Sequence, residues 1–310
     1  MSDINLASTD SESKTPAERE PAIKWGWVRA LLLLVVWFIV YAVVTSLMAV
    51  VMITLSGQDP MKMMSDQANL IETIGVGPAT LIHLIGFGST LLVIWIFRRF
   101  IDRRSLLSIG FKFKTHRNDF IAGLGWGFAL ILIGFIVLWI SGMLTITEIR
   151  FDPVNLFFYL IMFTIVAFNE EIVVRGYVLL NLMGSVNKYI ALLISSILFS
   201  AMHLANANIS VTAAINIFLA GLILGIYFIH KRNLWFSIGM HLTWNFFEGP
   251  IFGFEVSGNK TSSIIVQNIN GPDLLTGGEF GFEGSLIATV AIILITIVIH
   301  LKHRQSVQNI

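Results

Sequence analysis

Long apolar runs separated by polar connections dominate the chain. The runs lie at about 26–56, 77–98, 119–142, 154–183, 189–206, 209–230, 234–252 and 285–301. Most are long enough, at about 1.5 Å per residue, to cross a hydrocarbon core of about 30 Å. Because they are continuous rather than alternating, and because only helices or closed barrels satisfy every backbone group in lipid, they indicate helices. The pattern predicts an all-α, polytopic transmembrane bundle of about eight membrane helices.

The polar segments set the domain organisation. Residues 1–23 are rich in Ser and charged residues, which predicts a disordered cytoplasmic tail before a transmembrane bundle at 24–304. Residues 57–76 are expected to form a short interfacial helix. The Gly-rich residues 253–284 predict a turn-rich, non-cytoplasmic loop, either a cap over the bundle or a flexible connection.

Composition supports a membrane location. Hydrophobic residues make up 55% of the 310 positions and charged residues 13%, whereas soluble domains carry about 25% charged residues. A net charge of +1 gives no electrostatic reason to expect a nucleic-acid partner. The absence of Cys excludes disulfides, a thiolate nucleophile and Cys-ligated metals. The expected surroundings are therefore a lipid bilayer.

The distribution of basic residues predicts the orientation. Of the 20 Lys and Arg residues, 16 fall on the N-terminal side of the predicted spans, three on the opposite side and one within a span. Since cytoplasmic loops are enriched in Lys and Arg, the N-terminal side is expected to be cytoplasmic. We therefore expect a multi-pass protein of the cell membrane with both termini in the cytoplasm.

Charged groups at bilayer depth cost several kcal/mol, so each one within a span requires a physical explanation. Glu and Arg residues, together with His and Asn, cluster in three of the runs. They are Glu170, Glu171 and Arg175 in 154–183, His203 in 189–206, and His241 and Asn245 in 234–252.

Helical spacing assigns these polar residues to faces. Glu171 and Arg175 are four residues apart and can form an ion pair on one face. Glu170 is rotated about 100° from Glu171 and can face a cavity. His241 and Asn245 share a face and can point at one small volume.

A carboxylate, two imidazoles and an amide inside a membrane suggest a hydrolytic centre. Glu170 would act as general base on water, with His203 holding that water or shuttling its proton. His241 and Asn245 can donate hydrogen bonds to an oxygen that becomes negative when an amide is attacked. The same groups could instead bind a cation, and periodicity alone does not separate the two interpretations.

Three motifs on separate predicted helices now resemble a known family. They are Glu170-Glu171-x-x-x-Arg175, Phe199-x-x-x-His203 and His241-x-x-x-Asn245. This order resembles the signature of the CPBP family, which comprises CAAX prenyl proteases and bacteriocin-processing enzymes of the Abi group. The resemblance covers roughly residues 150–250, and it implies an intramembrane endopeptidase whose helices surround a polar cavity, with its core at about 150–252.

The resemblance also implies roles for individual residues. The implied catalytic residues are Glu170 and His203, which activate water, and His241 and Asn245, which form the oxyanion hole. The implied supporting residues are Glu171 and Arg175. Phe199 is expected to pack against the cavity wall.

Two alternatives compete with this interpretation. The family was long described as metalloproteases, and Glu170, His203 and His241 could supply three zinc ligands. There is no HExxH motif, so no cofactor is expected and zinc is the alternative. The protein could also be a non-enzymatic bacteriocin-immunity or partner-binding membrane protein. An ion-coupled transporter is disfavoured because no inverted repeat with paired broken helices is apparent.

Some features remain open at the sequence level. The expected substrate is a peptide or a membrane protein, prenylated or not. Glu248, beside Gly249 and Pro250, is expected at the membrane interface, and His83 lacks a partner pattern and is assigned no function. Glu170 lies about 22 Å from the outer end of its span and His203 about 22 Å from the inner end of its own. In a core of about 30 Å those heights differ unless helices are tilted, bent or re-entrant.

Overall fold

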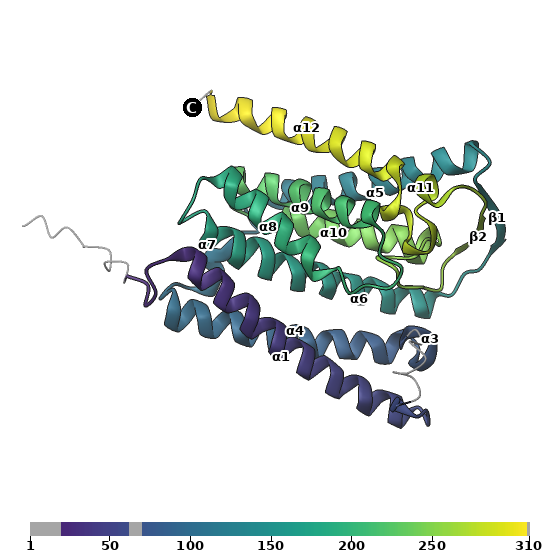
Figure 1. Ribbon diagram of the computed structural model, residues 1–310, viewed down its shortest axis with the longest axis horizontal. Helices are drawn as coiled ribbons and strands as arrows, with labels where there is room; N and C mark the ends of the chain where they lie inside the picture. The colour runs from purple at the N-terminus through teal and green to yellow at the C-terminus, as the bar shows by residue number, and fades with distance from the viewer. Residues whose placement is uncertain (1–19, 62–69, 309–310) are drawn as a thin grey trace, which may run out of the picture.

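The computed structural model describes residues 20–61 and 70–308 of the chain. Its helices run roughly along one long axis, with α1 and α4 paired on one side and α12 on the opposite side (Figure 1). The bounds are α1 (Gly26–Leu55), α3 (Leu70–Ile74), α4 (Val76–Ile96), α5 (Arg117–Ile140), α6 (Pro153–Glu171), α7 (Leu180–Leu182), α8 (Lys188–Met202), α9 (Val211–Lys231), α10 (Trp235–Phe246), α11 (Asp273–Thr276) and α12 (Leu286–Gln308). The predicted helical bundle is confirmed.

Several helices contain or adjoin irregular turns. The π-helical stretch η1 (Phe97–Ile101) extends α4, η3 (Ile172–Leu179) joins α6 to α7, and η4 (Phe247–Ile251) extends α10. Short 3₁₀ turns are η2 (Leu106–Ile109), η5 (Gly278–Phe280) and η6 (Phe282–Gly284).

Within the described residues, five helical rods are long and apolar enough to cross a membrane. They are Gly26–Leu55, Val76–Ile101, Arg117–Ile140, Pro153–Leu182 and Val211–Lys231. Lys188–Met202 and Leu286–Lys302 are apolar but shorter. A membrane protein is thus supported, whereas the predicted count of eight spans is not confirmed. The predicted tail at 1–23 lies mostly outside the described residues.

The height difference expected between Glu170 and His203 disappears in the structure. The rod from Pro153 to Leu182 has 30 residues, so it is about 45 Å long and exceeds the hydrocarbon core. Glu170 is therefore only about 18 Å from the Leu182 end of this rod. Helix α8 begins just after that end, runs back alongside the rod and is so short that it stops after about 22 Å, where His203 follows. The two residues consequently lie at similar heights.

Residues 253–284 form a folded segment, as the cap alternative expected. Its strand β2 (Ile265–Ile269) pairs antiparallel with β1 (Leu144–Ile149), a small sheet that the all-helical prediction did not contain. The Asn216 side chain on α9 donates to the Glu283 carbonyl at 2.7 Å. Phe254, Phe280 and Phe282 are fully buried, so the segment packs against the bundle as a cap.

Close packing between α5 and α10 positions one of the polar helices. A side chain at Gly123 or Gly127 of α5 would collide with the α10 backbone. The Thr243 hydroxyl on α10 donates to the Leu124 carbonyl at 2.9 Å. Small residues allow such close helix approach in membranes, so these two glycines determine where α10 lies.

Candidate active site

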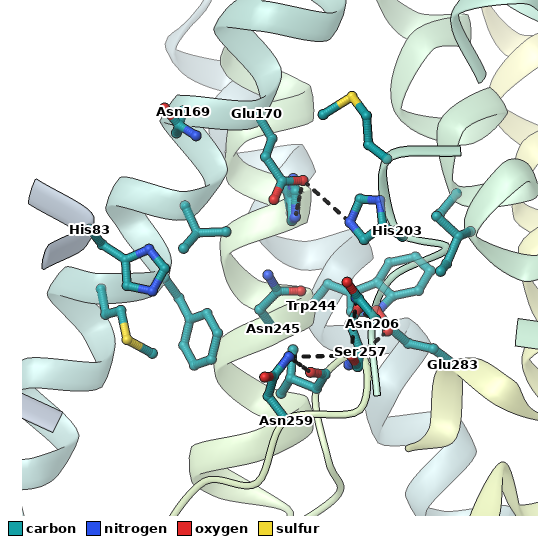
Figure 2. A pocket seen from close by; sticks show the side chains of 18 of the residues that line it. His83, Asn169, Glu170, His203, Asn206, Trp244, Asn245, Ser257, Asn259 and Glu283 are labelled. Atoms are coloured by element: carbon teal, nitrogen blue, oxygen red, sulfur yellow. Dashed lines mark hydrogen bonds and ion pairs between the residues drawn. The ribbon is translucent and has the colours of Figure 1, made fainter. Parts of the chain in front are cut away.

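The structure brings the four predicted catalytic residues to one cavity. Its volume is about 400 Å³, and its walls come from α1, α3, α4, α6, α8, α9, α10 and the 253–284 segment. Figure 2 shows Glu170, His203 and Asn245 around this space. His241 also lines it, although it comes from a third helix. Side chains that are distant in sequence thus share one pocket inside an apolar bundle.

Glu170, near the end of α6, faces both imidazoles. Its Oε2 atom lies 3.8 Å from Nε2 of His203 and 3.8 Å from Nε2 of His241. These separations exceed a direct hydrogen bond and suit contacts bridged by a water molecule. The same Oε2 atom is buried and makes no hydrogen bond to any described residue. Glu170 is therefore placed to hold water between itself and a histidine.

His203 is fixed in one tautomer by the end of α8. Its Nδ1 atom lies 2.8 Å from the Phe199 carbonyl, which can only accept a hydrogen bond. Nδ1 therefore carries the proton, and in the neutral ring Nε2 keeps its lone pair. That lone pair is on the side of the ring facing Glu170, so His203 can accept a hydrogen bond from water.

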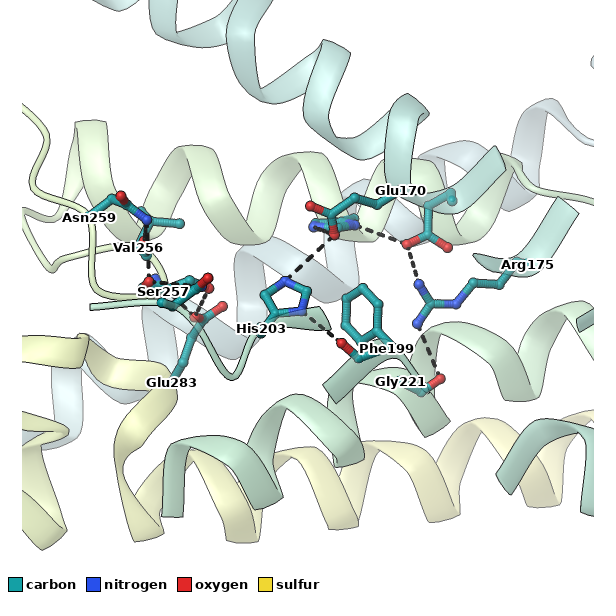
Figure 3. Close-up of polar contacts among 12 residues, drawn as sticks. Glu170, Arg175, Phe199, His203, Gly221, Val256, Ser257, Asn259 and Glu283 are labelled. Atoms are coloured by element: carbon teal, nitrogen blue, oxygen red, sulfur yellow. Dashed lines mark hydrogen bonds and ion pairs between the residues drawn. The ribbon is translucent and has the colours of Figure 1, made fainter. Parts of the chain in front are cut away.

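Glu171 forms the predicted ion pair with Arg175, which is labelled in Figure 3, and also contacts His241. Arg175 Nη1 donates to Glu171 Oε1 at 2.8 Å, and the same oxygen lies 2.9 Å from His241 Nδ1. Arg175 also donates to the Gly221 carbonyl at 3.3 Å and stacks over Phe199 at 4.4 Å. Both Glu171 and Arg175 are almost fully buried and neither lines the cavity, and the supporting role expected of them stays a prediction. Phe199 lines the cavity, as expected.

The Glu-Glu pair lies where regular helix changes into π-helix. Helix α6 ends at Glu171, and η3 begins at Ile172 and carries Arg175. Such wider turns are frequent at functional sites, because they change the direction of neighbouring side chains. Nothing in the apolar periodicity of this run distinguishes α-helical from π-helical turns.

Asn245 lies one helical turn after His241 and is 7% exposed. Its carboxamide lines the cavity and makes no hydrogen bond to another described residue. A donor of this kind, open toward the space beside Glu170, can bind an oxygen of a substrate.

The burial of Glu248 contradicts one prediction. It is 0% exposed rather than at the membrane interface. Its carboxylate accepts hydrogen bonds from Trp244 Nε1 at 3.2 Å and from the Glu283 amide at 3.1 Å. The reason is that η4 continues the helix past Phe246, so Glu248 stays in the bundle beneath the 253–284 segment.

Glu283 is a cavity residue that sequence reasoning missed. Its Oε2 atom accepts hydrogen bonds from the Ser257 amide at 3.1 Å and the Ser257 hydroxyl at 2.6 Å. Burial raises the pKa of the Glu283 carboxyl, opposed by the hydrogen bond from Ser257. No local pattern pointed to Glu283, because its burial depends on how a Gly-rich segment folds onto the bundle.

His83 is another missed residue, since it lines the cavity although no function was assigned to it. Among the described residues, no group of three or more His, Asp and Glu side chains is arranged to hold a metal ion. The zinc alternative with Glu170, His203 and His241 stays a prediction.

Comparison with family models matches residues 152–247 to the family described as Type II CAAX prenyl endopeptidase Rce1-like. The matched region contains all three motifs and confirms the resemblance to CAAX proteases. It spans less than a third of the chain. Neither curated proteins nor solved structures gave a match. Because the matched family consists of endopeptidases, the comparison supports an enzyme of the protease class.

Proposed function

We propose that the protein is an intramembrane endopeptidase that hydrolyses a peptide bond through a water molecule activated by Glu170. The observation that carries the proposal is the placement of Glu170 Oε2 at 3.8 Å from Nε2 of both His203 and His241, inside a cavity of the bundle. The family match to endopeptidases supports the same activity. The substrate is a peptide or membrane protein.

The first step is attack by water. The water lies between Glu170 and His203, and its second hydrogen is held by His203 Nε2. Glu170 takes one proton while the water oxygen forms a bond to the carbonyl carbon of the peptide. The electron pair of the C=O π bond moves onto the carbonyl oxygen, which becomes an oxyanion.

The second step needs donors for that oxyanion. Asn245 can supply an amide N–H, whereas His241 donates its Nδ1–H to Glu171 and can also donate from Nε2 only as the doubly protonated imidazolium. Donors of this type already stand in place before the charge develops, which makes them effective in a water-poor site.

The last step releases the products. The oxyanion re-forms the carbonyl, the C–N bond breaks, and the proton held by Glu170 passes to the leaving nitrogen. One product then has a new carboxyl terminus and the other a new amine, while Glu170 returns to its starting form.

The test compares membrane and secreted peptides from cells that produce wild-type protein, Glu170→Gln or Glu279→Gln. Glu279 is exposed, so its variant controls for the loss of a carboxylate elsewhere. We expect a set of cleavage products in wild type and Glu279→Gln that Glu170→Gln lacks, with equal amounts of protein in the membrane. Identical products from Glu170→Gln would refute the proposal.

A further inference from the structure

Three polar side chains in the cavity have no role in the steps above. Tyr41 of α1, His83 of α4 and Asn169 of α6 all line it. In the part of the chain that the structure describes, none of these side chains makes a hydrogen bond to another residue. Asn169 is the most extreme, being 5% exposed with a buried, unpaired Oδ1 atom. We call these three residues the α1–α4 strip.

Helix contacts place the strip along one wall. The Phe87 and Phe168 rings lie 6.4 Å apart, so Asn169 is near the height of Phe87 on α4. The Tyr41 ring packs against Gly86, the residue before Phe87. His83 lies one helical turn before Gly86. The strip therefore extends outward in the order Asn169, Tyr41, His83.

The strip lies across the cavity from His203. Figure 2 shows Asn169 and His83 on one side of Glu170 and His203 on the other. A substrate with its scissile bond beside Glu170 would therefore extend along the strip. The strip lies mainly on the α1–α4 pair, whereas the three catalytic motifs come from later helices.

Unpaired polar groups are rare in a protein interior, because an amide without a partner loses hydrogen bonds that water would supply. The backbone of a cleavable peptide also requires hydrogen-bond partners. Its scissile bond must leave the helical conformation to be attacked, and its backbone N–H and C=O groups then find no partners in hydrocarbon. The strip and an unwound peptide are thus complementary.

We propose that the α1–α4 strip binds the backbone amides of an extended substrate segment next to the scissile bond. This inference rests on the proposed endopeptidase function and names the part of the substrate that the site recognises. The Asn169 carboxamide can donate and accept, matching the C=O and N–H of a backbone. The Tyr41 hydroxyl and a neutral His83 ring can also do both. Recognition is therefore of the extended backbone and tolerates varied side chains.

The variants Asn169→Leu and Tyr41→Phe separate this role from a structural one. Each removes a polar group that has no described partner: Tyr41→Phe deletes one hydroxyl, and Asn169→Leu keeps the number and branching of the side-chain heavy atoms. We expect an unchanged or higher melting temperature, because an unpaired buried group disappears. A residue that holds the fold together would instead lower the melting temperature on substitution. Tyr189→Phe, at an exposed tyrosine on α8 outside the cavity, is the matched control.

Binding is measured in full-length Glu170→Gln protein in nanodiscs, so that cleavage does not interfere. The probes are fluorescein-labelled twelve-residue peptides of Leu, Ala and Ser, read by fluorescence anisotropy. We expect Asn169→Leu to weaken binding about tenfold, the effect of losing one well-made hydrogen bond. Replacing one backbone amide of the probe by an ester should cost about the same in the parent protein and nothing in Asn169→Leu.

The outcomes distinguish the two proposals. If the parent, Asn169→Leu and Tyr41→Phe proteins bind the probes with equal affinity, or if all three fail to bind, the proposed role of the α1–α4 strip is refuted. Cleavage of the same peptides by wild-type protein tests the endopeptidase function separately. Binding that depends on the strip, without any cleavage by the wild-type protein, would refute the endopeptidase function and support the strip as a peptide-binding site.

Discussion

Asn245 offers the sharpest test of the oxyanion hole. Its side chain makes no hydrogen bond to another described residue, so Asn245→Ala should leave the melting temperature nearly unchanged. We expect kcat to fall about 10²–10³-fold with little change in KM, because the bond forms mainly in the transition state. Steady-state kinetics on a peptide found by the product comparison provide the measurement. Exposed Asn270→Ala is the control, and an unchanged kcat in Asn245→Ala would exclude the role.

Glu283 links stability to pH. Burial raises the pKa of its carboxyl above the ordinary value of a glutamate, so the folded state binds the proton more tightly than the unfolded state. The contribution of Glu283 to stability is therefore greatest below the unfolded pKa, and it is lost as pH rises through the raised folded pKa.

Glu283→Gln keeps an acceptor for Ser257 and removes the titration. We expect its melting temperature to fall less with rising pH than that of wild type, over the interval above about pH 4.5. Thermal unfolding in detergent at a series of pH values measures this difference. Parallel curves for the two proteins would show that the carboxyl does not titrate differently in the folded state.

Metal removal tests the zinc alternative. The proposed mechanism activates water with Glu170 and His203 alone, so dialysis against EDTA should leave the cleavage rate unchanged. Loss of cleavage on dialysis and its recovery on adding zinc would instead favour Glu170, His203 and His241 as ligands.

At the residue scale, the sequence predicted contacts between residues that are close together in the chain. The Glu171–Arg175 pair follows from four-residue spacing on one helix, and the structure contains it. Burial of Glu248 was not predictable, because it depends on a segment that folds back about 35 residues later. His83 was missed for a similar reason, since its surroundings are a cavity built from several helices.

At the scale of elements, the α5–α10 contact should affect both the stability of the protein and its cleavage rate. Gly127→Ala places a methyl group against the Met240 carbonyl and should force the α10 backbone outward. We expect a loss of stability of about 1–3 kcal/mol and a lower cleavage rate, because α10 carries His241 and Asn245. Gly125→Ala lies on the same helix with nothing within 4 Å of the added carbon. Equal melting temperatures and rates in both variants would contradict this prediction.

Apolar runs predicted the helices well and their ends less well. The fifth run was expected to reach residue 206, whereas α8 ends at Met202. The last residues of that run leave the helix, and Asn206 hydrogen-bonds to Ser257 in the distant cap at 3.1 Å. The β1–β2 pair was missed because each strand is short and its partner is more than 100 residues away.

At the scale of the whole molecule, the distribution of Lys and Arg predicts the topology. The N-terminal end of α1 and the C-terminal end of α12 lie at the same end of the molecule, opposite the β1–β2 sheet (Figure 1). If the cytoplasmic side is the basic one, the cap formed by residues 253–284 is outside.

The lack of Cys makes this topology easy to test. We expect a membrane-impermeant maleimide to label Lys260→Cys in intact cells, because this exposed position lies in the cap. Val186→Cys, between α7 and α8, should react only after lysis. Reactivity in the opposite order would invert the predicted orientation.

The shortness of α8 matters for peptide hydrolysis inside a membrane. Each cleaved peptide bond consumes one water molecule, and the hydrocarbon core of a bilayer contains almost no water. At about 22 Å, α8 is about 8 Å shorter than a hydrocarbon core of about 30 Å, and Asn206, Ser257 and Asn259 border the cavity beyond its end. We expect water to enter the cavity along these polar groups from one side of the membrane, while packed helices close the other side. Water would then reach Glu170 without a continuous aqueous path across the bilayer.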